Sequence, residues 1–188
     1  MKKALLAGLL FSYPLAVFFG LKYSEPAVVG GFFAAILLLR HFVVKNTKAS
    51  IPHLKIMTIS GVGLLVFATL ANSALALKFY PVVINACFLV VFLYSLYQSP
   101  SVVEMIASKF ETLDEKGRHY TRQVTKVWCG FFIINGSIAG ATVFHPDPAV
   151  WLTYNGLISY IFMGLIMAVE FLVRRWQKAK NNSDEVAK

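Results

Sequence analysis

Residues 127–144 read VWCGFFIINGSIAGATVF, a run of eighteen residues without a charged side chain. A second long apolar run, at 150–173, contains a single charge, Glu170, near its end. An α-helix needs about 20 mostly apolar residues to cross roughly 30 Å of hydrocarbon. Backbone groups in lipid must pair within their own segment, which a helix achieves. The two runs therefore predict transmembrane helices.

Four further apolar runs precede these two, at 4–21, 27–44, 56–76 and 81–97. Of the 188 residues, 57% are hydrophobic and only 14% are charged, whereas soluble domains carry about 25% charged residues. We therefore predict an all-α, polytopic membrane bundle of about six transmembrane helices, forming one domain over residues 1–176. The polar tail at 177–188 is predicted to be a disordered cytoplasmic segment.

The N-terminus has some features of a secretory signal. Lys2 and Lys3 precede an apolar stretch, but no small-x-small cleavage site follows before Ser24, and Pro26 opens the next apolar run. We interpret this stretch as a retained first span.

The Lys and Arg residues are distributed asymmetrically around the six runs. If the N-terminus lies in the cytoplasm, all eighteen except Lys22 and Lys78 fall on the cytoplasmic side. An excess of Lys and Arg marks cytoplasmic loops and sets the orientation of membrane proteins. The sequence therefore predicts a bacterial inner-membrane protein with both termini in the cytoplasm. Its net charge of +9 suits anionic lipid headgroups and not nucleic acid.

The one sizeable loop, residues 98–126, begins with a helix start signal. Ser101 followed by Glu104 fits a capping box. The apolar residues that follow fall on one helical face: Val102, Val103, Ile106, Phe110 and Leu113. We predict a short amphipathic cytoplasmic helix that ends at Gly117 and lies in the membrane interface or under the bundle.

A basic segment then leads into the fifth span, with Arg118, His119, Arg122 and Lys126. The last three of these share one helical face. Two interpretations stay open. The segment is either a collar that contacts lipid headgroups, or a docking site for an acidic partner or an anionic lipid-linked substrate.

Four asparagines lie within the apolar runs: Asn72, Asn85, Asn135 and Asn155. An amide in hydrocarbon needs a hydrogen-bond partner, so each is expected to face the bundle interior or water. Near the inner end of the last span, Glu170 and Arg174 have the spacing and order that favour a helical ion pair. We interpret them as a structural pair, with a proton-coupled site as the alternative.

Small residues recur at a spacing of four. Gly136 and Gly140 form a GxxxG pair, and Gly30 with Ala34 is a similar pair. Such pairs let helix backbones approach closely. Packing within the bundle is the first interpretation, and association of two copies through Gly136 and Gly140 is the second.

Residue types that commonly carry catalysis or bind metals are scattered. The four histidines divide between the two sides of the predicted membrane, so they cannot form one metal site. The two cysteines lie inside apolar runs without metal-ligand spacing. The common hydrolase and phosphate-binding motifs do not occur in the sequence. We therefore predict no catalytic, cofactor-binding or metal site.

Two segments carry a family resemblance. They are HYTRQVTKVWCGFF at 119–132, continuing to Asn135-Gly136, and YNGLISY at 154–160, followed by Gly164, Glu170 and Arg174. Together they resemble an uncharacterised family of bacterial inner-membrane proteins, often encoded beside fatty-acid-synthase-like genes, including those for aryl polyene pigments. The resemblance covers most of the chain and is strongest from Gln98 onward.

The chain is more distantly similar to the intracellular septation protein A family. The shared pattern is SPSVV at 99–103, a polar loop, and then Trp128, Phe131 and Phe132 at the start of a span. That family is linked to envelope integrity and septation. The resemblance implies a role in envelope biogenesis and transfers no catalytic residue.

Three hypotheses of function follow. The first is a non-enzymatic scaffold in envelope or acyl-lipid and polyene biogenesis, which binds a synthase or acyl carrier proteins on its inner face. The second is a small transporter or flippase for a lipid-like substrate, which would use the intramembrane asparagines and Glu170. The third is a membrane-embedded acyl-transfer enzyme with His119 and Cys129 as its reactive residues.

The charge asymmetry makes a direct prediction about sidedness. Single cysteines placed within 101–126 should not react with a membrane-impermeant thiol reagent added from the periplasmic side of intact cells. They should react once the inner membrane is opened. Labelling of this region in intact cells would contradict the orientation.

Overall fold

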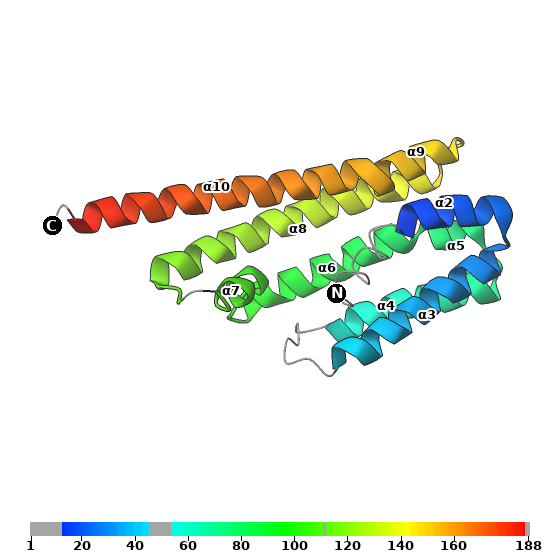
Figure 1. Cartoon of the computed structure of the whole chain (residues 1–188), viewed down its shortest axis with the longest axis horizontal. Helices are drawn as coiled ribbons and strands as arrows, with labels where there is room; N and C mark the ends of the chain where they lie inside the picture. Colours follow the sequence, from blue (N-terminus) through cyan, green and yellow to red (C-terminus); the bar gives the residue numbers. More distant parts are fainter. Residues whose placement is uncertain (1–12, 46–53, 111, 187–188) are drawn as a thin grey trace.

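The computed structural model describes residues 13–45, 54–110 and 112–186, and within these ranges its regular elements are all helices (Figure 1). In chain order they are α2 (Tyr13–Tyr23), α3 (Pro26–Lys45), α4 (Leu54–Leu70), α5 (Ala74–Lys78), α6 (Tyr80–Tyr97), α7 (Val102–Ala107), α8 (Glu115–Val143), α9 (Pro148–Thr153), the π-helix η1 (Tyr154–Ile158) and α10 (Ser159–Val186). The predicted all-α class is confirmed. Lys2, Lys3, Lys48 and the first part of run 4–21 lie outside the described residues.

The long helices lie side by side and alternate in direction (Figure 1). The turns that join α2 to α3, α5 to α6 and α8 to α9 all lie at one end of the bundle, called here the α9 end. Helix α7 and the C-terminus lie at the opposite end, called the α7 end. Lys22 and Lys78 lie in the last turns of helices α2 and α5, at the α9 end. The charge asymmetry of the sequence therefore becomes an asymmetry between the two ends of the bundle.

Three helices in the described ranges are long and apolar enough to cross a membrane, not six. They are α6, α8, and the continuous stretch from Pro148 to Trp176 that contains α9, η1 and part of α10. The other three apolar runs also form helices, whose described parts do not combine membrane length with sufficient hydropathy. The described part of α2 has 11 residues and α4 has 17, which at 1.5 Å per residue gives roughly 16 and 25 Å. Helix α3 has 20 residues, roughly 30 Å, and Pro26–Leu38 is an apolar part of it.

The loop predicted at 98–126 is mostly helix. Its capping box is confirmed: Ser101 Oγ accepts from the Glu104 N–H, and Glu104 Oε2 accepts from the Ser101 N–H. Helix α7 ends at Ala107, however, and not at Gly117. The Gly117 N–H instead donates to the N-cap Asp114 in the first turn of α8, with an N···Oδ1 distance of 2.8 Å. Residues 115–126 therefore form a polar extension of the fifth span.

The run predicted at 56–76 is interrupted by a turn. Helix α4 ends at Leu70, and Asn72 adopts a left-handed conformation with φ of 45°, which asparagine tolerates better than most residues. Its exposed side chain accepts a hydrogen bond from the Ala27 N–H, 3.0 Å away, at the start of α3. Asn72 is thus a capping residue at the α9 end and does not face the bundle interior.

Helix α10 continues through residues 177–186, where the sequence predicts a disordered tail. Residues Gln177, Lys178, Ala179 and Lys180 all have high helix propensity. Extending an existing helix costs far less than starting one. The apolar part of α10 supplies that start.

The tightest contact between α3 and α4 occurs at Gly30. A Cβ added there would lie 2.5 Å from Thr69 Oγ1 and 3.2 Å from the Leu65 carbonyl oxygen. The Thr69 hydroxyl donates to that same carbonyl, so a methyl group would press on a bonded pair. The neighbouring Gly31 faces open space. Of the two glycines, only Gly30 is needed for packing.

This pair of adjacent glycines gives a matched test. Gly30→Ala should lower the free energy of unfolding by about 1–3 kcal/mol, as overpacked sites do. Gly31→Ala should be neutral or stabilising, because alanine favours a helix over glycine. Thermal unfolding of both variants in the same detergent measures the difference. Equal effects would contradict the described contact between α3 and α4.

Candidate functional site

A hydrogen-bonded chain of polar side chains joins α6, α8 and η1 inside the bundle. Asn135 Nδ2 donates to Asn85 Oδ1 over 3.0 Å, and the Tyr154 hydroxyl donates to Asn135 Oδ1 over 3.0 Å. Asn85 Nδ2 in turn donates to the Pro81 carbonyl oxygen, 2.8 Å away. All three side chains are buried. Asn135 is therefore the central residue of this amide chain, the name used below for Asn85, Asn135 and Tyr154.

The amide chain forms where α6 and α8 approach most closely. A Cβ added to Gly136 would lie 3.1 Å from the Asn85 Cβ, so a side chain there would push the helices apart. Gly140, one turn later, faces Val82 of the same helix, α6. The structure thus gives Gly136 and Gly140 a packing partner within the chain, in agreement with the first interpretation of the pair.

Asn155 occupies a second polar cluster, in the π-helical turn η1. Its Nδ2 lies 3.1 Å from Thr142 Oγ1 of α8 and 2.9 Å from the Trp151 carbonyl oxygen. The backbone carbonyl oxygen of Asn155 accepts a hydrogen bond from the Ser159 hydroxyl. A π-helical turn disturbs the regular backbone hydrogen bonds of an α-helix. Here the Asn155 and Ser159 side chains donate to the backbone carbonyls of Trp151 and Asn155. Just before this turn, the Trp151 indole N–H of α9 donates to the Lys78 carbonyl and fastens α9 to α5.

Aromatic side chains fill the bundle between the amide chain and the α7 end. Phe88 and Phe132 stack with ring centroids 5.1 Å apart, and Phe92 meets Phe132 edge-on at the same distance. Trp128 and Phe131 extend this cluster toward α10, where Met163 and Ile166 pack against it. The interior at this level is apolar. The amide chain is therefore separated from the polar groups at the α7 end.

A second set of polar contacts holds the α7 end together. Ser95 Oγ, near the end of α6, accepts from the Val102 N–H of α7 over 3.1 Å. The buried Thr125 of α8 lies with its Oγ1 3.2 Å from Ser101 Oγ. These contacts place α7 against α6 and α8, so α7 is part of the bundle and not a free loop.

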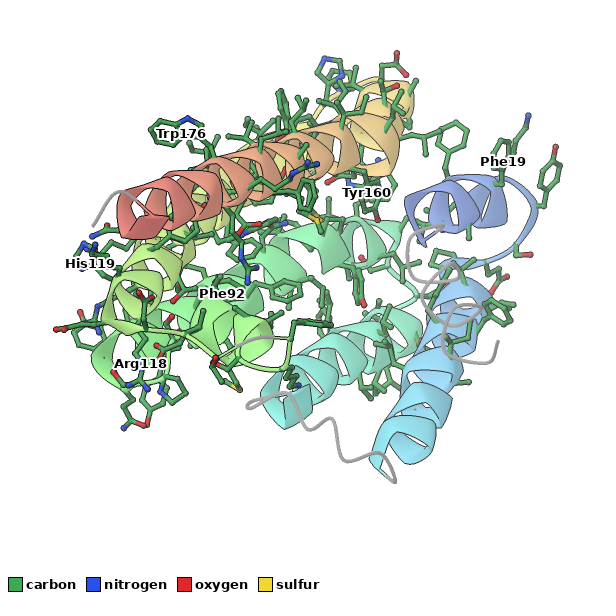
Figure 2. The ribbon with its side chains drawn as sticks, turned by 60° about the vertical axis from the view of Figure 1, so that its left-hand side comes forward. Phe19, Phe92, Arg118, His119, Tyr160 and Trp176 are labelled. Carbon is green, nitrogen blue, oxygen red and sulfur yellow. The ribbon has the colours of Figure 1, made fainter. Side chains whose placement is uncertain are left out.

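Two of the four predicted basic residues take part in these contacts. Arg122 Nη2 donates to the Leu96 carbonyl oxygen over 2.6 Å; a cation is favourable there, at the negative C-terminal end of α6. Arg118 lies 3.8 Å from Glu104 of α7, but its side chain is 67% exposed, so this ion pair contributes little to stability. His119 and Lys126 are exposed on α8, and the His119 ring is 3.3 Å from Gln123 Nε2. Figure 2 shows Arg118 and His119 at this end.

Glu170 is partly buried beside α8. The Tyr120 hydroxyl of α8 donates a hydrogen bond to the backbone carbonyl oxygen of Glu170 over 3.3 Å. This bond fixes the register between α8 and α10. The ion pair between Glu170 and Arg174 stays a prediction.

Several residues that complete these clusters were not singled out from the sequence. Tyr154 and Thr142 lie opposite the predicted asparagines, and Tyr120 lies opposite Glu170. Their only signal is a hydroxyl beside or within an apolar run. In contrast, the structure does not bring His119 and Cys129 together: His119 is exposed, and Cys129 is buried almost three helical turns away on the same helix. No group of three potential metal-binding side chains occurs in the described ranges.

Hydrogen bonding is complete in the described interior: no buried side-chain nitrogen or oxygen there lacks a partner. The outer surface has the opposite character. Large apolar side chains are exposed on α3, α4, α6, α8 and α10, among them Phe32, Phe67, Val90, Ile134 and Phe162. Figure 2 shows Phe19 and Trp176 pointing away from the bundle. An apolar surface of this extent is typical of contact with lipid and not with water.

Comparison with known proteins adds no relative: no family model matches the chain, and neither a curated protein nor a solved structure matches it significantly.

The amide chain predicts a measurable coupling between helices. Asn135→Ala removes the partner of both Asn85 and Tyr154, so it should destabilise the protein more than Tyr154→Phe. The pair Asn135→Ala and Tyr154→Phe should show a coupling energy of roughly 0.6 kcal/mol, and at most ~1.7 kcal/mol, the range for hydrogen bonds between membrane helices. Unfolding in mixed micelles measures both the loss of stability in each variant and the coupling energy of the pair.

Ser137→Ala serves as the control, because Ser137 is exposed on the same helix. It should leave the free energy of unfolding unchanged. An Asn135→Ala variant as stable as Ser137→Ala would contradict the role of the amide chain.

Proposed function

We propose that this protein crosses the bacterial inner membrane six times, with both termini in the cytoplasm. The alternating directions of α2, α3, α4, α6, α8 and the α9–α10 stretch support six crossings. The position of Lys22 and Lys78 at the α9 end supports the orientation, because every other Lys and Arg falls toward the opposite side in this topology. In this topology the α7 end lies in the cytoplasm.

Within that membrane, we propose a non-enzymatic scaffold for envelope or acyl-lipid and polyene biogenesis. The observation that carries the proposal is that every buried polar side chain in the described part of the chain has a hydrogen-bond partner. Amides that bond to one another serve as links between helices and leave little for a substrate to bind. The two family resemblances supply the biological setting. The basic α7 end is the surface we assign to acidic acyl carrier or synthase proteins, by charge complementarity.

Charge reversal at the α7 end tests the scaffold. Lys109→Glu with Lys116→Glu alters two exposed residues near α7. After cross-linking in cells and purification of the tagged chain, this variant should recover several-fold less acyl carrier or envelope-synthesis protein than the unaltered chain. Attraction between complementary surfaces acts over about 10 Å at physiological salt, so neighbouring charges contribute together.

The matched control is Lys22→Glu with Lys78→Glu, which makes the same change in charge at the α9 end. It should leave recovery unchanged. Equal loss in both variants, or no loss in either, would contradict a specific surface at the α7 end.

A small transporter or flippase for a lipid-like substrate is the second candidate. The π-helical turn η1 favours it, because π-helical turns inside helices occur frequently at functional sites. It also contains Asn155, and its Tyr154 bonds to Asn135. In this case the two clusters would exchange partners as the substrate passes.

Lipid flux into liposomes separates the two candidates. A transporter predicts flux that falls at least several-fold in Asn135→Ala and Asn155→Ala, and a scaffold predicts no flux above that of protein-free liposomes. Flux that is indifferent to both changes would remove the argument for these residues.

A further inference from the structure

The exposed face of α8 near the α7 end carries a compact basic patch. Arg122, Gln123 and Lys126 are all exposed and lie on adjacent turns of one side of the helix. The bond from Arg122 Nη2 to the Leu96 carbonyl holds the guanidinium at the surface. That bond uses one of the five N–H donors of an arginine. The patch thus presents two positive charges and an amide on one surface.

This patch lies at the same level along the bundle as an apolar part of α10. The bond between Tyr120 and Glu170 fixes the register of the two helices, which run in opposite directions. The α8 segment after Tyr120, with the patch, therefore runs beside the α10 segment before Glu170. That segment, residues 164–169, has no polar side chain, and its Leu165 and Val169 are 54% and 58% exposed.

The next turn of α10 keeps the same character. Phe171, Leu172 and Val173 separate Glu170 from the first cation, Arg174, and the exposed Trp176 follows. Tryptophan and arginine at this point mark the membrane–water interface. The patch on α8 therefore lies about two to three helical turns from Arg174 along α10, toward the α9 end, and level with the C-terminal end of α6, where Arg122 bonds the Leu96 carbonyl.

Positive charges at this depth are costly unless an anion meets them. Side chains on a helix lean toward its N-terminus, which for α8 is the α7 end, so Arg122 and Lys126 reach toward the interface while their stems stay in apolar surroundings. Above the patch, α8 exposes Val127 and Ile134. A molecule that fits this surface has an anionic head and apolar tails.

We propose that Arg122 and Lys126 bind the phosphate of an anionic phospholipid, whose acyl chains lie on the exposed apolar face of α8. Gln123 donates a further hydrogen bond to the headgroup. This site rests on the membrane placement proposed above and gives the basic segment a defined ligand. The bound headgroup would lie on α8, next to the surface at the α7 end that we assign to protein partners.

Native mass spectrometry of the full chain in detergent tests the site, with phosphatidylglycerol, phosphatidylethanolamine or oleate added. The unaltered chain should retain phosphatidylglycerol in preference to the other two. Lys126→Gln should weaken retention about fivefold, and Arg122→Gln with Lys126→Gln about 25-fold, as expected for surface charges on anionic lipid. The single variant leaves the contact between Arg122 and Leu96 intact.

Lys22→Gln with Lys78→Gln, at the α9 end, is the matched control and should retain phosphatidylglycerol normally. Equal retention of phosphatidylethanolamine, or retention unchanged in both patch variants, would overturn the site. Stronger retention of oleate would overturn the assignment to a phospholipid. Because partner recovery is tested at Lys109 and Lys116, failure of the scaffold and failure of this lipid site give different results.

Discussion

An amide inside hydrocarbon must find its hydrogen-bond partner within the protein, and the packing of α6, α8 and η1 follows from that constraint. Asn135 lies on α8 between Asn85 and Tyr154 and bonds to both. Gly136 allows the close approach of α6 that this bonding requires. Each such bond is worth little by itself, about 0.6 kcal/mol. Its effect is to fix which faces of the helices meet.

The same constraint explains how the two faces of the helices differ. The buried polar groups of the described residues bond to each other or to backbone carbonyls, and aromatic rings fill the interior between the two polar levels. Apolar side chains cover the outside, most completely on α10, where 6% of the membrane-length segment is buried. α10 meets α8 along one stripe that includes Met163, Ile166 and Glu170. Such an exterior is typical of contact with lipid.

Hydropathy predicted the long helices well, because apolar runs and their breaks are local features of the sequence. The run at 81–97 became α6 at Tyr80–Tyr97, and the Ser101–Glu104 box started α7 as expected. Hydropathy could not show that α8 begins at Glu115, because a polar helical extension looks like a loop. The decisive signal was the N-cap Asp114. The number of crossings stays a prediction, because three helices in the described ranges reach membrane length and hydropathy and an apolar run does not fix the length of its helix.

The candidate site was predicted in part. Asparagines in apolar runs indicated that Asn85, Asn135 and Asn155 face inward, and all three are buried. Which residues bond to them depends on how the helices are rotated against each other, so Tyr154 and Thr142 could not be paired with them in advance. Asn72 had the same local signal but lies in a turn, where the following Ser73 caps α5. The Ser73 that follows Asn72 is the sequence feature that distinguishes this turn asparagine from the three buried ones.

Quenching of tryptophan fluorescence by lipids brominated in their acyl chains tests most directly whether the apolar exterior faces hydrocarbon. In liposomes, a variant whose only tryptophan replaces the exposed Leu165 should be strongly quenched. A variant that keeps only Trp151, which is 1% exposed, should be quenched little. Equal quenching of the two, or stronger quenching of Trp151, would contradict a bundle whose polar groups face inward and whose apolar surface meets lipid.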